Sequence, residues 1–149
     1  AIDRVTGAVA QGPFEIEILT DARFTGRLTL RNFTLGQLGL LGAALLDLGD
    51  GLVPMGYGKS RGLGRVTVDF QAVQIRTLRQ PDGAIWGIGA LAREAERQAY
   101  QLPSADKERL PVTLPVVRER GFYTLRSAGD ATTAWLEAAA ALWVEEVAA

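Results

Sequence analysis

The chain contains no cysteine and no histidine among its 149 residues. The absence of cysteine excludes disulfides and thiolate metal sites, and it fits the reducing cytoplasm, where we expect the protein to act. The absence of histidine removes the commonest acid–base group at neutral pH and the commonest metal ligand. A Ser-His-Asp triad and a histidine zinc site are therefore excluded, and we predict neither a cofactor nor a metal site.

The sequence also lacks a long apolar run and a strong excess of one charge. Apolar residues make up 48% of the chain, but their longest run is far too short to cross a bilayer, so no membrane partner is expected. The net charge of −1 argues mildly against nucleic-acid binding. The cations are unevenly placed, however, because residues 50–80 hold five of them against two acids. Local patches decide binding more than totals do.

Residues 13–33 alternate between apolar and polar residues on both sides of a three-residue connection. This pattern predicts a β-hairpin in which Ile16 faces Leu28 and Glu17 faces Arg27, with the apolar side chains on one face. The opposite face would carry Arg27, Thr29 and Arg31. That face is either solvated, with Glu–Arg pairs across the strands, or turned toward a nucleic acid.

A helix is predicted to follow the hairpin, because Thr34 and Gln37 match the T-x-x-Q capping box. Leucines at helical spacing form its core-facing stripe: Leu35, Leu38, Leu41, Leu45 and Leu48. Glycines interrupt this helix at a cost of roughly 1 kcal/mol each, and we expect them to let it lie close on a sheet. The helix is expected to end at Gly49. A strand is predicted from Val66, with a bulge at Ala72-Val73 after which Ile75 lies on the other face.

The second half of the chain carries weaker signals. Residues 89–101 predict a short polar helix, residues 102–115 are expected to be irregular, and residues 116–126 predict one or two strands. The last segment predicts a helix with Asp130 at its N-cap. Its apolar stripe is either core packing or a docking face for a partner. The stripe consists of Trp135, Leu136, Ala139, Leu142 and Trp143.

The stretch GYGKSRGLGRV, residues 56–66, holds four glycines and three cations. It matches two phosphate-binding motifs only in part. A P-loop would need a glycine where Val53 stands, and a dinucleotide fingerprint would need one where Arg61 stands. Both motifs also run from a strand into a helix, whereas the predicted order here is reversed, so a helix dipole cannot assist.

A third interpretation of this stretch is a clamp on an RNA backbone. Glycines can take positive φ angles and let backbone N–H groups approach an anion. Arginine can grip a phosphate with two hydrogen bonds. On residue types alone, this clamp and a mobile surface loop with solvated charges explain the pattern equally well. The candidate residues are Gly56, Gly58, Lys59, Ser60, Arg61, Gly62, Gly64 and Arg65.

The stretch, after a leucine-rich helix and before a strand, resembles the signature glycine loop of the RAMP superfamily, the repeat-associated proteins of CRISPR systems. The family pattern G-x-G-x-x-R-G-x-G-x-V is filled by Gly56, Gly58, Arg61, Gly62, Gly64 and Val66. Residues 2–19, IDRVTGAVAQGPFEIEIL, resemble the IDR-x-TG-x-A segment and hairpin of backbone subunits in type III effector complexes. The resemblance covers residues 1–76 and adds Arg4 and Thr6 as weaker candidates for RNA contact.

The resemblance implies an α+β fold, ferredoxin-like and RRM-related, with a partial ββαβ unit, an antiparallel sheet and a C-terminal extension ending in a helix. It divides the chain into a partial RAMP domain at 1–79 and an extension packing on it at 80–149. It further implies a subunit of a type III CRISPR interference complex that binds guide RNA, next to target RNA and other RAMP subunits. The alternative is a structural or assembly module, or a dimerising fragment, without direct RNA contact.

In that family the IDR-x-TG segment lies in the middle of the chain, after a loop with the aspartate implicated in target-RNA cleavage. That region is not present before Ala1, which suggests a fragment or one half of a split subunit. We therefore expect no catalytic residue here, and we interpret Asp3, Asp21 and Asp69 as structural. A sheet without its first strand has an open edge. We expect a second copy, a swapped strand, the missing N-terminal half, or residues 112–126 to cover it.

Overall fold

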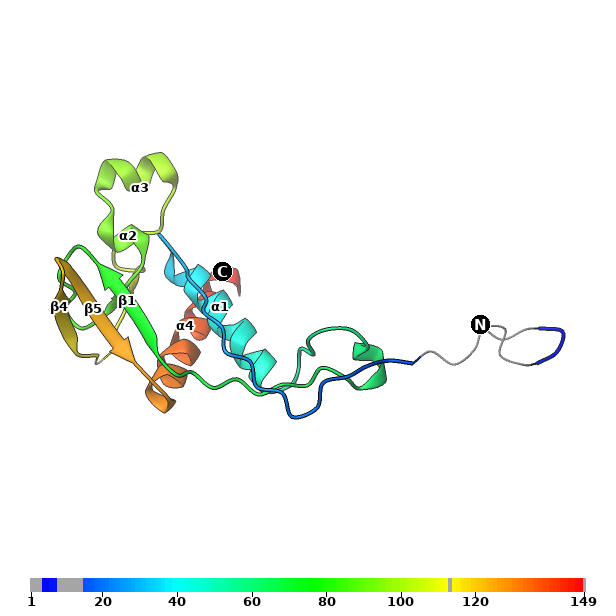
Figure 1. Ribbon diagram of the computed structural model, residues 1–149. Helices are drawn as coiled ribbons and strands as arrows, with labels where there is room; N and C mark the ends of the chain where they lie inside the picture. The colour runs from blue at the N-terminus through cyan, green and yellow to red at the C-terminus, as the bar shows by residue number, and fades with distance from the viewer. Residues whose placement is uncertain (1–3, 8–14, 113, 149) are drawn as a thin grey trace.

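The body of the molecule consists of two long helices and a small antiparallel sheet, shown in Figure 1 from a computed structural model that describes residues 4–7, 15–112 and 114–148. The helices are α1 (Leu35–Gly49) and α4 (Asp130–Ala148). The sheet has the strand order β1 (Val73–Thr77), β5 (Phe122–Ser127) and β4 (Val116–Glu119). The predicted α+β class with an antiparallel sheet and a C-terminal helix is confirmed, and the arrangement is consistent with a partial ferredoxin-like fold.

Shorter elements connect these parts. They are η1 (Lys59–Arg61), β2 (Ile85–Trp86), α2 (Ile88–Leu91), α3 (Glu94–Tyr100) and β3 (Arg109–Leu110), of which β2 and β3 pair. The short polar helix predicted over 89–101 is therefore present as α2 and α3, and the strands predicted over 116–126 are β4 and β5. In the described ranges, no helix has both the length and the apolar character that a membrane span requires.

The start and the end of α1 follow the sequence signals. The Gln37 N–H donates to the Thr34 hydroxyl at 3.2 Å, and the Thr34 N–H donates to the Gln37 side-chain oxygen at 3.1 Å. This reciprocal capping box satisfies donors that the first turn of a helix leaves unpaired. The helix ends at Gly49, and Gly51 takes a left-handed φ of 74°. The predicted limits of this helix are confirmed.

The glycines of α1 allow a close approach to α4 rather than to a sheet. A Cβ added to Gly39 would lie 2.2 Å from the carbonyl oxygen of Ala139 and 2.8 Å from the Cβ of Trp143. These atoms belong to the backbone and the rigid base of a side chain, so they cannot move aside cheaply. The expectation that the helix lies on a sheet through its glycines was therefore wrong, because the partner at this point is another helix.

A Gly39→Ala variant is expected to be less stable, although alanine is the better helix former. Alanine gains roughly 1 kcal/mol of helix propensity over glycine. Forcing apart a packed interface costs about 1–3 kcal/mol, and here the obstacle is backbone. Urea unfolding followed by circular dichroism measures the net change. Gly49→Ala is the matched control, since its added Cβ would meet only Val68 at an ordinary 3.5 Å. A more stable Gly39→Ala variant would contradict the close packing.

The hydrophobic core lies between the α1–α4 pair and the inner face of the sheet. Its buried members come from both halves of the chain: Leu35, Leu38, Ile85, Leu110, Trp135, Leu136 and Ala139. Leu142 packs against this cluster, and Trp143 is half-buried next to Gly39. The apolar stripe of α4 is therefore core packing, and its interpretation as a docking face was wrong.

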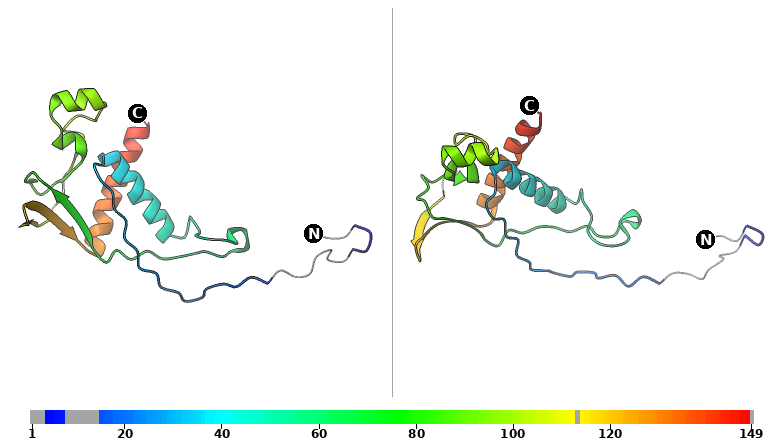
Figure 2. Two further views of the ribbon diagram at one scale, coloured as in Figure 1. Left: turned by 45° about the horizontal axis from the view of Figure 1, so that its top comes forward. Right: turned by 90° about the horizontal axis from the view of Figure 1, so that it is seen from above.

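The predicted hairpin is absent from the described residues 15–33, and Pro13 and Phe14 lie outside the part that the structure describes. Residues 15–31 are extended, belong to no strand and are exposed throughout. Figures 1 and 2 show this segment, which we call the arm, leaving the body as a single chain. An isolated two-stranded hairpin is marginal in water unless a third strand or a helix covers its apolar face. No described residue does so here, which is the physical reason for the error.

The strand predicted from Val66 through Ile75 forms only in its last part. Residues 63–72 are extended but form no ladder, and β1 starts only at Val73. The ladder starts there because β5 supplies a neighbour, with Val73 opposite Ser127 and Ile75 opposite Leu125. Of the partners expected at the sheet edge, the C-terminal extension therefore covers one side of β1. The other side of β1 pairs with no described strand.

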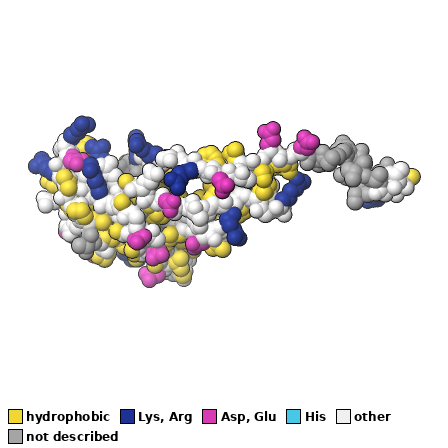
Figure 3. Space-filling view, turned by 60° about the horizontal axis from the view of Figure 1, so that its bottom comes forward, with side chains coloured by type: hydrophobic (Ala, Val, Ile, Leu, Met, Phe, Trp, Pro, Cys, Tyr) yellow, Lys and Arg dark blue, Asp and Glu magenta, His cyan; other side chains and the backbone are white. Residues whose placement is uncertain are grey.

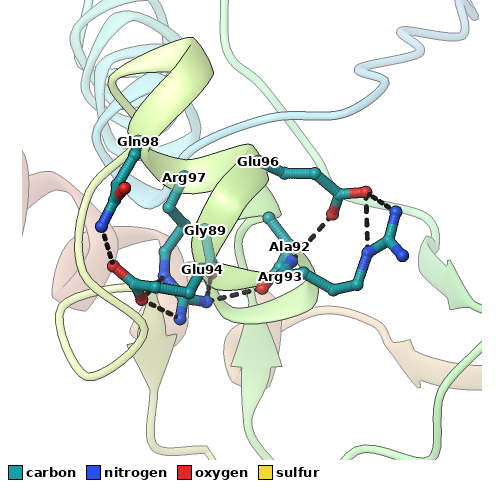
Figure 4. Close-up of polar contacts among 7 residues, drawn as sticks. All are labelled: Gly89, Ala92, Arg93, Glu94, Glu96, Arg97 and Gln98. Carbon is teal, nitrogen blue, oxygen red and sulfur yellow. Dashed lines mark hydrogen bonds and ion pairs between the residues drawn. The ribbon is translucent and has the colours of Figure 1, made fainter.

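Helices α2 and α3 are held together by a local network of charged groups (Figure 4). One guanidinium nitrogen of Arg97 donates to the carbonyl oxygens of Gly89 and Ala92, while the others bind Glu94. Hydrogen bonds from Arg97 lower the pKa of Glu94, and those from Arg93 lower the pKa of Glu96. Apart from Arg97, which is half-buried, these side chains are exposed, so the contribution of the ion pairs to stability is modest.

Candidate nucleic-acid interface

The glycine-rich loop, residues 51–65, projects from the end of α1 away from the sheet (Figures 1 and 2). Most of its side chains are exposed, and Tyr57 is 82% exposed. The short η1 turn forms the far end of the loop. A loop that projects in this way can approach an extended polymer without any rearrangement of the core.

All four glycines of the loop signature have positive φ angles. The values are 84° at Gly56, 80° at Gly58, 78° at Gly62 and 92° at Gly64. Residues with side chains rarely adopt this conformation, so the expected positive φ angles of these glycines are confirmed. Gly64 is constrained further, because a Cβ there would lie 2.0 Å from the carbonyl oxygen of Met55. The sequence pattern therefore specifies this loop conformation.

The backbone amides of the loop fall into two groups. The Met55 N–H donates to the Gly64 carbonyl at 2.8 Å, and the N–H groups of Arg61 and Gly62 donate to carbonyls within the loop. Those donors are already used. The N–H groups of residues 56–60 donate to no acceptor in the part of the chain that the structure describes. An anion would therefore meet free amides on the Gly56–Ser60 side.

The three cations of the loop are exposed: Lys59, Arg61 and Arg65. None of them forms an ion pair or a hydrogen bond with a residue in the described ranges. Arg65 lies across the base of the loop, with its Nε 3.2 Å from the position a Cβ would take on Gly51. By contrast, Arg126 on the sheet is neutralised by Glu119 at 2.7 Å. The loop charge is thus available to a polyanion.

Arg4 and Thr6 lie in a separate exposed turn at residues 4–7. Figures 1 and 2 show this turn apart from the glycine loop. The structure does not bring these two candidates together with the loop cations. Ile2 and Asp3, which complete the IDR-x-TG segment, lie outside the described residues.

The basic sheet face predicted from Arg27, Thr29 and Arg31 does not exist, because these residues belong to the arm. The sheet that is present turns other side chains outward. Arg76 of β1 covers the ring of Phe122 in β5, with its guanidinium carbon 4.3 Å from the ring centre. Next to this pair is an open hollow of about 510 Å³ lined by Gln74, Arg76, Glu119 and Arg120. Figure 3 shows basic side chains gathered over this end of the molecule.

Sequence reasoning missed Phe122, Arg120 and Tyr57 as members of basic or exposed surfaces. Arg120 and Phe122 could have been found from the turn Arg120-Gly121, which closes the β4–β5 hairpin. Both turn residues have positive φ angles. Tyr57 is flanked by Gly56 and Gly58, so a projecting aromatic ring is foreseeable there. Exposed aromatic rings next to cations are typical of surfaces that bind single strands.

The acidic residues do not form a metal site in the described ranges. No group of three or more Asp or Glu residues lies close enough there to hold an ion. Asp21 has a φ of 55° at a bend of the arm, and Asp69 is exposed on residues 63–72. Comparison of the chain with protein-family models, with curated proteins and with solved structures gave no match.

Proposed function

We propose that this chain binds the sugar–phosphate backbone of a CRISPR guide RNA through the glycine-rich loop, as a RAMP-type subunit of a type III interference complex. The proposal rests on the conformation of the loop and on the exposure of its cations. It projects from the body, has every signature glycine in the left-handed conformation and exposes three cations without ion pairs among the described residues. A loop with only a structural role would need its left-handed glycines but would not need three exposed cations beside them.

The proposed contact recognises phosphates and not bases. Free N–H groups at residues 56–60 would hydrogen-bond phosphate oxygens, while Lys59 and Arg61 would neutralise their charge. Tyr57 offers a ring on which one base can stack whatever its identity. Such binding leaves the Watson–Crick edges of the remaining bases free to pair with target RNA.

The proposal extends to partners and location. Guide RNA, target RNA and other RAMP subunits are the partners, and the cytoplasm is the compartment. No residue of this chain is assigned a catalytic role, so RNA cleavage by the complex would depend on residues elsewhere.

Purified protein is expected to carry RNA and to rebind it without regard to sequence. The first measurement is the 260/280 nm absorbance ratio after purification, followed by nuclease treatment. The second is fluorescence anisotropy with two single-stranded RNAs of equal length and unrelated sequence. Affinities within about threefold of each other are expected, because backbone contacts carry no sequence information. Nucleic-acid-free protein that binds neither RNA at low salt would contradict the proposal.

A second candidate function is an assembly module without direct RNA contact. The exposed apolar side chains of the arm favour it, since such surfaces mark interaction sites. The same purification distinguishes the two functions. Clean protein that self-associates on a sizing column would support assembly, whereas bound RNA supports the first proposal.

A further inference from the structure

The arm exposes apolar side chains that a monomer has no reason to keep in water. Phe24 is 79% exposed, Leu28 68% and Ile18 53%. Figure 3 shows hydrophobic side chains lying open on the narrow extension next to the body. The backbone N–H and C=O groups of residues 15–31 also form no hydrogen bond with any described residue. An extended segment with open backbone groups is a template for pairing with another strand.

The apolar residues of the arm lie on one face. Even-numbered positions carry Ile16, Ile18, Thr20, Ala22, Phe24, Gly26, Leu28 and Leu30. Odd-numbered positions carry all the charges, with Leu19 as an apolar exception. Because successive side chains of an extended chain point to opposite sides, this alternation gives one apolar and one polar face in each of the two extended stretches, before and after the bend at Asp21.

The charges of the arm are divided by sign along its length. The acids Glu15, Glu17 and Asp21 occupy the first half, and the bases Arg23, Arg27 and Arg31 occupy the second. None of these six side chains has an ion-pair partner in the described part of the chain. A parallel pairing of two arms would place like charges together, whereas an antiparallel pairing places the acidic half on the basic half.

We propose that two copies of this chain dimerise by antiparallel pairing of their arms around a two-fold axis near Ala22. In this register Ile16 faces Leu28 of the other copy, Glu17 faces Arg27, and Asp21 faces Arg23. The apolar faces then coincide, and each contact occurs twice, as a two-fold interface requires. The bend at Asp21, where φ is 55°, lies next to this axis.

The pairing between copies depends on the same apolar–polar alternation that predicted a hairpin within one chain. Exchange of a contact within one chain for the same contact between two chains is the principle of domain swapping. The arm is open in the structure, so its pairing groups are available to a second copy. This dimer does not require RNA, and its failure would leave the proposed role of the glycine loop intact.

Charge reversal in the arm tests the proposal with the full-length chain. The variants are E17R and R27E, both in exposed positions away from the core. We expect wild-type protein to be a dimer by sedimentation velocity at 0.1 M salt. Each variant alone faces like charges at both ends of the ladder, so its dimer dissociation constant is expected to rise at least tenfold. Circular dichroism verifies that both variants remain folded.

An equimolar mixture of the two variants is the decisive sample. In a mixed dimer every reversed residue again faces an opposite charge, so dimerisation is expected to return to within about threefold of the wild type. A mixture that remains monomeric while the wild type dimerises would overturn antiparallel arm pairing. Wild-type protein that is monomeric, or variants that dimerise unchanged, would overturn it as well.

Discussion

A Glu108→Ala variant is expected to lose about 3–5 kcal/mol of its free energy of unfolding, since each buried hydrogen bond to a charged group contributes about 1.5–3 kcal/mol. Glu108 is only 2% exposed. One carboxylate oxygen accepts the Leu35 N–H at 2.9 Å, and the other accepts the Gly89 N–H at 3.2 Å. Alanine would leave both donors buried without this acceptor, and urea unfolding measures the loss.

The position of Glu108 explains why the effect should be large. Leu35 is the first residue of α1 and Gly89 lies in the first turn of α2, so one carboxylate joins the starts of two helices. Negative charge is favoured at the start of a long helix such as α1. Gly87 and Gly89 leave the space, because a Cβ on Gly87 would come within 1.8 Å of the carboxylate.

Two further variants distinguish the specific role of Glu108 at the two helix starts from the effect of removing any negative charge. Glu108→Gln keeps the shape but replaces one acceptor oxygen by an NH₂ group that faces a donor, so an intermediate loss is expected. Glu137→Ala removes an exposed carboxylate from α4 and should change stability by no more than about 0.5 kcal/mol. Equal stability of the Glu108→Ala and Glu137→Ala variants would contradict a joining role for Glu108.

Local signals predicted well the parts of the fold that depend on neighbours in sequence. The capping box at Thr34 and the left-handed glycines of the loop are set by geometry within a few residues, and both are present. The strand pattern over 116–126 belongs to a hairpin closed by its own turn, and it too is present. In each case the interaction partner lies within a few positions along the chain.

Features that depend on distant partners could not be predicted in the same way. Alternation in residues 15–31 indicates an apolar face but does not say which surface will cover it, and the predicted hairpin is absent. Glu108 lies in a stretch expected to be irregular, and its donors are 73 and 19 residues away. Its one sequence signal is the pair Gly87 and Gly89, whose role as a space for a carboxylate appears only in three dimensions.

Removal of two loop cations is expected to weaken RNA binding about 100-fold at 0.1 M salt, since two charge-assisted hydrogen bonds are lost. The variant is Lys59→Ala/Arg61→Ala. Both side chains are exposed and belong to the projecting glycine-rich loop, so the fold should be unaffected. Fluorescence anisotropy with a single-stranded RNA measures the change.

The matched control removes the same two kinds of charge away from the loop. Arg79→Ala/Lys107→Ala changes the net charge equally at two other exposed positions. A general attraction between protein and RNA would weaken alike in both double variants. A contact at the loop predicts that only the Lys59→Ala/Arg61→Ala variant loses most of its affinity.

The salt dependence of RNA affinity tests the loop contact most directly. For single strands, the slope of log K against log salt concentration changes by about 0.7 for each phosphate that a cation neutralises. The Lys59→Ala/Arg61→Ala variant is therefore expected to show a slope shallower than the wild type by about 1.4, with the Arg79→Ala/Lys107→Ala control unchanged. Equal slopes for the wild type and the loop variant would show that these cations touch no phosphate, and the proposed function would be wrong.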